Sequence, residues 1–295
     1  MSKYRFTGHE SFQCRNLWLK KGYDFVKQEK RDFNDDLSVI DLGVGKNMVS
    51  SIRFWTRAFG ILNREDEKPT WIANYLFGNK GADKYLEDVG TLWLLHYKLI
   101  SKEEASIYSL VFNEFRKQRI EFTKDHLKKF LENKCNEEGE SHSLNSIDTD
   151  IGVFLKSYLT PDSEDGRKSI EDQYSSLLID LDLVKKFNNA GFNDKEWYKI
   201  ESSEREQLPI EIFFYAILDN YSDNRSISIH KLLNDKNSPG LVFALNPDAL
   251  VKKVKALAKS FYGIVYKEDA GVRELQINKD YKTKEILDQY YGRSK

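Results

Sequence analysis

Hydrophobic residues recur at helical spacing along most of the chain. In the first hundred residues this pattern predicts three helices, over 17–28, 37–40 and 46–59. Two short apolar pairs, Ile61-Leu62 and Trp71-Ile72, flank the polar stretch 63–69 and predict two strands with a wing between them. Three helices followed by a hairpin is the order of a winged helix-turn-helix domain.

The middle of the chain is also predicted to be helical. Residues 89–100 are apolar almost all round, which is typical of a buried helix. The spacing of Ser101 and Glu104 matches a capping box and predicts a helix that runs to about Lys117. Further helices are expected over 123–134, 145–159 and 176–187, and the charged stretch 201–207 is expected to be a linker.

The last ninety residues repeat the order of the first hundred. The pattern predicts a helix over 210–218, a strand and helix over 226–233, a long helix from Asn246, and a hairpin of 264–266 with 272–277. The expected fold is therefore mainly α with small β wings. Two winged helix-turn-helix domains, 1–100 and 208–295, are joined by a helical middle domain, 101–207.

The segment from Gly43 to Arg57 carries the most informative pattern. Three cations and a small hydroxyl fall within about 60° of one another on a helix. They are Lys46, Ser50, Arg53 and Arg57. The apolar side chains point the other way, and the polar face carries no acid. Such a face suits DNA recognition, and the free N–H groups at the helix start favour a phosphate. The alternative is an ordinary solvated face.

Charge and composition restrict the partners. Lys and Arg total 46 and Asp and Glu total 47, so a net charge of −1 confines any nucleic-acid site to a local patch. Residues 1–60 and 248–295 each carry a net charge of +4, around an acidic middle. Two basic ends could grip a duplex, or they could dock on that middle. Two cysteines, no secretory signal and no apolar run of spanning length lead us to expect a cytoplasmic protein without a membrane segment.

Other chemistry finds little support in the residue spacing. The Gly43-Val-Gly-Lys46 string lacks the spacing of a nucleotide-binding P-loop. The pairs His9 with Cys14 and Cys135 with His142 lack zinc-site spacing. His9-Glu10 is a possible acid/base pair, but a capping or core position for His9 is favoured. His96, in an apolar helix, is expected to be a core histidine.

Several longer motifs resemble the domain of unknown function 4007 family. They are Phe6-Thr-Gly-His-Glu-Ser-Phe12, Trp18-Leu-Lys-Lys-Gly, Leu42-Gly-Val-Gly-Lys-Asn-Met-Val-x-Ser-Ile-Arg-Phe-Trp55, Tyr85-Leu-Glu-Asp-x-Gly-Thr-Leu-Trp-Leu-Leu-His96, Asn145-Ser-Ile-x-Thr-Asp150, Ser238-Pro-Gly-Leu-Val-Phe243 and Asp269-Ala-Gly271. The resemblance implies bacterial genes often found beside DNA-modification and phage-defence genes, including DNA phosphorothioation genes. It supplies no activity and no catalytic residues. The acid-rich loop 63–69 departs from what a groove-binding wing needs.

The sequence leads us to expect a non-enzymatic DNA-binding or targeting protein of a DNA-modification or phage-defence system. Its partners would be double-stranded DNA and proteins of that system, with no cofactor, metal or catalytic residue. The expected DNA contacts are Lys46, Asn47, Ser50, Arg53 and Arg57, with a weaker second set at Lys252, Lys253 and Lys255. The alternative is a protein-interaction scaffold that does not touch nucleic acid. A hydrolase using His9 and Glu10 is a third, weaker possibility.

Overall fold

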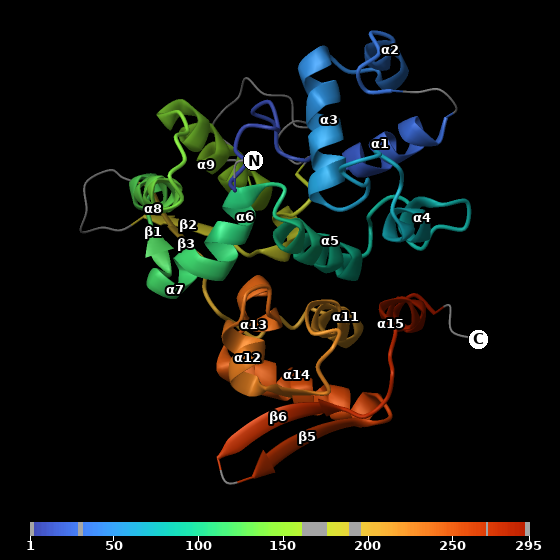
Figure 1. Ribbon diagram of the computed structural model, residues 1–295, viewed down its shortest axis with the longest axis vertical. Helices are drawn as coiled ribbons and strands as arrows, with labels where there is room; N and C mark the ends of the chain where they lie inside the picture. Colours follow the sequence, from blue (N-terminus) through green and yellow to red (C-terminus); the bar gives the residue numbers. More distant parts are fainter. Residues whose placement is uncertain (1–2, 29–31, 161–175, 189–195, 270, 293–295) are drawn as a thin grey trace. The chain divides into compact units, whose positions relative to one another are not determined.

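The computed structural model describes residues 3–28, 32–160, 176–188, 196–269 and 271–292. It is mainly helical, with two small three-stranded antiparallel sheets (Figure 1). The chain divides into two compact units, Met1–Ile200 and Glu201–Lys295. The expected division into three domains stays a prediction.

The first unit is built mainly of short and medium-length helices. Its helical elements are α1 (Trp18–Lys27), α2 (Ser38–Leu42), α3 (Lys46–Ala58), α4 (Trp71–Phe77), α5 (Val89–Lys102), α6 (Ser106–Leu110), η1 (Val111–Phe115), α7 (Arg116–Gln118), α8 (Lys124–Glu137), α9 (Leu144–Tyr158) and η2 (Ile179–Leu181). Its sheet has the order β1-β3-β2, from β1 (Glu121–Phe122), β2 (Lys185–Asn188) and β3 (Glu196–Lys199).

The core of this unit surrounds α5 and the inward face of α3. All of α5 from Gly90 to Ile100 is buried, which confirms the predicted buried helix. Its Asp88 cap accepts from two backbone N–H groups. Trp55 on α3 is fully buried and donates from its indole Nε1 to the carbonyl oxygen of Phe12 at 3.0 Å. The N-terminal segment is thereby held against α3.

The predicted N-terminal wing is wrong. Leu62 and Pro69 form a single bridge, and the residues expected to be the second strand begin helix α4. The reason is a helix cap. Thr70 Oγ1 accepts from the N–H of Ala73 at 3.3 Å and donates to the carbonyl oxygen of Gly60 at 2.7 Å. The loop 63–69 therefore leads into a helix.

Two further local predictions are corrected. Ser101 opens no helix, because α5 continues to Lys102 and ends where Glu103 adopts a left-handed conformation. The next helix starts at Ser106 and includes a π-helical turn, η1. The helix expected over 176–187 is a short 3₁₀ turn followed by β2, because residues 185–188 pair antiparallel with β3, the next strand along the chain.

The second unit follows its predicted order closely. Its helices are α11 (Ile210–Asn220), α12 (Ile229–Asn234), α13 (Pro239–Val242), α14 (Pro247–Ser260) and α15 (Thr283–Tyr290). Its strands are β4 (Ser226–Ser228), β5 (Ile264–Asp269) and β6 (Val272–Ile277), in the order β4-β6-β5. Asn246 caps α14 by accepting from the N–H of Ala249, which confirms the predicted start of the long helix. The β5–β6 hairpin lies along α14 (Figure 1).

None of the helices that the structure describes is long and apolar enough to cross a membrane.

We predict that Trp55→Ala destabilises the first unit strongly. Removal of this buried indole should lower the free energy of unfolding by about 3–5 kcal/mol. Lys46→Ala, an exposed change on the same helix, should stay within about 0.5 kcal/mol. Urea denaturation of the whole chain, followed by far-UV circular dichroism, measures both. Equal losses would show that the inward face of α3 has been misassigned.

Candidate nucleic-acid interface

The position of α3 follows from the turn before it. Gly43 takes a left-handed conformation with φ of 61°, which favours glycine, and Gly45 is the extended N-cap residue of α3. No side chain caps this end, and its first turn holds no acid. The N–H groups at the start of α3 therefore lack a side-chain acceptor.

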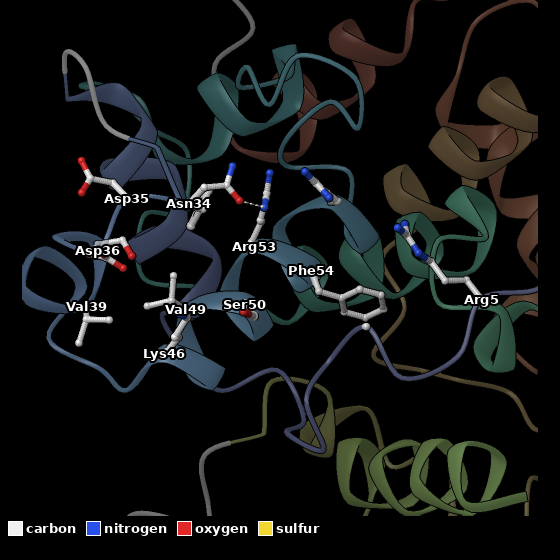
Figure 2. A pocket seen from close by; sticks show the side chains of 14 residues that line it. Arg5, Asn34, Asp35, Asp36, Val39, Lys46, Val49, Ser50, Arg53 and Phe54 are labelled. Carbon is white, nitrogen blue, oxygen red and sulfur yellow. Dashed lines mark hydrogen bonds between the residues drawn. The ribbon is translucent and has the colours of Figure 1, made fainter. Parts of the chain in front are cut away.

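Four of the five predicted contact residues on α3 lie together around one cavity of about 400 Å³ (Figure 2). They are Lys46, Ser50, Arg53 and Arg57. Lys46 and Ser50 are exposed, whereas 28% of the Arg53 side chain and 18% of the Arg57 side chain are exposed. Asn47 is exposed but does not line the cavity. The predicted grouping of the four side chains is confirmed.

A further cation comes from a distant part of the sequence. Arg5 lines the same cavity, next to Phe54 (Figure 2). The N-terminal segment reaches this place because Gly8 lies against the Phe54 ring, where an added Cβ would stand 2.3 Å from a ring carbon. Arg5 pairs with the buried carboxylate of Glu104, which also lies 3.4 Å from Arg64. Nothing in the local pattern around Arg5 indicates this position.

The helix pattern alone suggested that the arginine face of α3 is free of acid. The structure shows that an acidic side chain from another segment lies on it. Glu67, from the loop 63–69, brings one carboxylate oxygen, Oε1, to both guanidinium groups. Arg53 donates to it from Nε at 2.6 Å, and Arg57 donates to it from Nη2. Arg53 also donates to Oδ1 of Asn34 at 2.7 Å. The sequence predicted a solvated or DNA-facing surface without acid. The contact of Glu67 with Arg53 and Arg57 corrects that prediction.

Positive charge nevertheless dominates this side of the cavity. The pKa of Arg57 is lowered to about 10, by burial first and then by Arg53, Arg5 and Arg64. One carboxylate between two guanidinium groups leaves a surplus of positive charge. An anion that enters here would relieve that repulsion.

Another part of the cavity lining has different chemistry. It comes from the segment before α2 and from α2 itself, with Phe33, Asn34, Asp35, Asp36, Ser38 and Val39. Both aspartates are exposed, and Asp35 Oδ1 accepts from the N–H of Leu37 at 2.9 Å. The cavity lining is therefore mixed in charge, with cations from α3 and from Arg5 and two carboxylates from the segment before α2.

Two of the histidines and both cysteines considered from the sequence are buried, whereas His142 is half-buried and lies 3.1 Å from Glu140. His9 is buried and stacks on Trp55, with Nε2 3.3 Å from Asp150 Oδ1, whereas Glu10 is exposed. His96 is buried with Nδ1 3.0 Å from the Tyr158 hydroxyl. The predictions of core positions for both histidines are confirmed.

Burial raises the pKa of both thiols, Cys14 and Cys135, so the nucleophilic thiolate is disfavoured. In the described part of the chain, no group of three or more His, Cys, Asp or Glu side chains could hold a metal ion.

The predicted second contact set lies on α14 in the other unit. Lys252 pairs with Glu204 at 2.8 Å, and Lys253 donates to the carbonyl oxygen of Leu208 at 2.9 Å. Burial, followed by Lys252, lowers the pKa of Lys253. Lys255 lies over the Tyr266 ring, 5.0 Å from its centroid. Each lysine thus has a partner within its own unit, and contact with DNA stays a prediction.

The family described as "Protein of unknown function (DUF4007)" matches residues 6–291, nearly the whole chain. The chain belongs to this DUF4007 family. No curated protein matches it. Two solved structures share its fold, "Magnesium ion-bound SspB crystal structure" with a TM-score of 0.86 and "SspB crystal structure" with 0.85. Each of the two is 28% identical in sequence to this chain, and each match covers 99% of this chain and 89% of the chain in the solved structure.

We predict that inorganic phosphate stabilises the first unit through this cavity. At a phosphate concentration tenfold above its Kd, binding adds about 1.4 kcal/mol. The melting temperature should then rise by about 3–6 °C. Thermal unfolding measures the rise, with chloride at equal ionic strength as the reference. The double variant Arg53→Ala/Arg57→Ala should lose it, and an unchanged rise in that variant would place the anion elsewhere.

Proposed function

We propose that this DUF4007 chain binds double-stranded DNA through the basic wall of the α3 cavity and serves as an accessory or targeting protein of a DNA-modification or phage-defence system. The observation that carries the proposal is the convergence of Arg5, Arg53 and Arg57, with Lys46, on one cavity. Guanidinium groups bind phosphate oxygens in pairs, which makes arginine clusters suited to a nucleic-acid backbone.

The start of α3 supports the same proposal. Its N–H groups have no side-chain cap, Lys46 stands in its first turn, and Ser50 is small enough to let a backbone approach. A helix start of this kind attracts phosphate. The acid-rich loop 63–69 makes contact by the expected wing unfavourable, so α3 supplies the interface in this proposal.

We also propose that the second unit is a winged helix. The order α11, β4, α12, α13, α14 and then the β5–β6 hairpin supports this. In the proposal its lysines add a weaker contact with the DNA backbone, through Lys252, Lys253 and Lys255. These three already have partners, so their share of the binding energy is expected to be small.

We predict that Arg53→Ala/Arg57→Ala weakens duplex binding while the fold is retained. Each lost phosphate contact should lower the slope of log affinity against log salt by about 0.9. If Arg53 contacts a guanine edge, sequence preference should also relax by about 1–3 kcal/mol. Fluorescence anisotropy of a labelled duplex across a salt series measures both quantities, with plain and phosphorothioated DNA compared.

The matched control is Lys128→Ala/Lys134→Ala on α8. It removes the same charge from two ion-paired cations, of which 26% and 21% are exposed, and neither lines the cavity. Equal losses from the two double variants would mean that net charge alone drives binding. No duplex binding by the unaltered chain would favour the scaffold alternative.

A second candidate function adds a divalent cation to the same site. The favouring observation is that one of the two similar structures, the SspB crystal structure described as magnesium ion-bound, contains that cation. Mg²⁺ commonly uses one or two carboxylates together with substrate phosphates. Asp35 and Asp36 line the same cavity as the arginines, so two carboxylates are available to that pattern with a DNA phosphate as the further ligand. Mg²⁺ bound there would neutralise phosphate charge.

We predict that the unaltered chain binds the duplex more tightly in Mg²⁺ than in EDTA at equal ionic strength. The double variant Asp35→Asn/Asp36→Asn should bind it equally in both. The same samples with supercoiled plasmid, resolved on an agarose gel, would reveal any strand cleavage. Equal effects of Mg²⁺ on both proteins would exclude these aspartates. Relaxed plasmid would contradict the expectation of a non-enzymatic protein.

A further inference from the structure

Glu67 lies where an anionic ligand of the arginine pair would lie. Its Oε1 accepts from Arg53 Nε at 2.6 Å and from Arg57 Nη2, so a single oxygen stands between two guanidinium groups. A non-bridging phosphate oxygen accepts from arginine in the same manner. The carboxylate carries one negative charge, as does a phosphodiester. Glu67 is thus a chemical stand-in for a backbone phosphate.

The loop that carries Glu67 is closed at its base. The N–H of Asn63 donates to the carbonyl oxygen of Lys68 at 2.9 Å, and the N–H of Thr70 donates to that of Ile61 at 2.9 Å. Glu67 itself has a left-handed φ of 54°. Non-glycine residues adopt this region at a cost of about 1–2 kcal/mol. The strained backbone at Glu67 therefore favours movement of the loop away from the arginines when the Glu67 carboxylate loses its contacts with them.

The arginine pair is incompletely satisfied by this carboxylate. Among the described residues, the buried Nε of Arg57 has no hydrogen-bond acceptor. Arg5 and Arg64 add positive charge near Arg57. The carboxylate of Glu104 forms ion pairs with both Arg5 and Arg64. Both guanidinium groups share one of the two carboxylate oxygens of Glu67, Oε1, whereas a backbone phosphate placed there could present both of its non-bridging oxygens. A second oxygen could accept from the free Nε.

We propose that Glu67 is an internal competitor that occupies a phosphate subsite formed by Arg53 and Arg57, and that a DNA backbone phosphate displaces it. This inference rests on the proposed function. The loop 63–69 then acts as a gate on the α3 interface: closed by its own carboxylate in the free protein, and open when a DNA phosphate takes the place of that carboxylate.

The test is Glu67→Gln in the whole chain, measured by anisotropy with the labelled duplex. Loss of the competing charge should tighten duplex binding by about two- to fivefold, the range expected for one surface ion pair. The matched control is Glu114→Gln, which removes the same charge from an ion pair with Lys134 at 3.0 Å. The gain should be absent from that control. It should also disappear when Glu67→Gln is combined with Arg53→Ala/Arg57→Ala.

Phosphate-induced stabilisation gives an independent readout without DNA. Glu67→Gln should show a larger rise in melting temperature with inorganic phosphate than the unaltered chain. If that variant does not fold, Glu67→Asp, with a shorter side chain and the same charge, should show the same changes to a smaller degree. Unchanged or weaker binding of both duplex and phosphate would overturn the subsite. A larger phosphate effect without any duplex binding would keep the subsite and overturn the DNA proposal.

Discussion

The burial of Trp55 is the contact on which the candidate interface depends. Its indole donates to the backbone of Phe12, stacks on His9 and meets the edge of Tyr108 from α6. These contacts bring the N-terminal segment, α3 and α6 together and fix the rotation of α3 about its axis. With Trp55 inward, the 3.6-residue period directs Arg53 and Arg57 to the opposite side. The same contact holds in place the segment that delivers Arg5.

The charges around α3 set the electrostatic character of this face. Burial, followed by repulsion from the neighbouring guanidinium groups, lowers the pKa of Arg57. Glu67 and Glu104 compensate part of the charge. The remainder is a local surplus of positive charge on a chain whose net charge is −1. A local site on a neutral protein favours specific contact over general attraction to DNA.

In the second unit, the three α14 lysines assigned to DNA contact are each held by a separate partner. Its α14 carries four lysines, yet the three assigned to DNA contact are occupied by a carboxylate, a backbone carbonyl and an aromatic ring. A basic stripe in a sequence therefore does not establish an available surface. The difference from α3 lies in convergence: on α3 the cations share a cavity, whereas on α14 each has a separate partner.

The sequence by itself determined the helices with strong periodicity and clear caps, α3, α5 and α14, and the face on which the α3 cations lie, because these depend on residues a few positions apart. It also indicated a core position for His9. Tertiary structure decided the rest. Pairing with β3 drew residues 185–188 into a sheet, Arg5 reached the α3 face from the N-terminal segment, and Glu67 reached it from the loop that follows α3. Such contacts join residues without a common periodicity, so local patterns carry no signal for them. The start of α4 is different, because the Thr70 cap acts on Ala73 and is a local signal that the strand prediction overlooked.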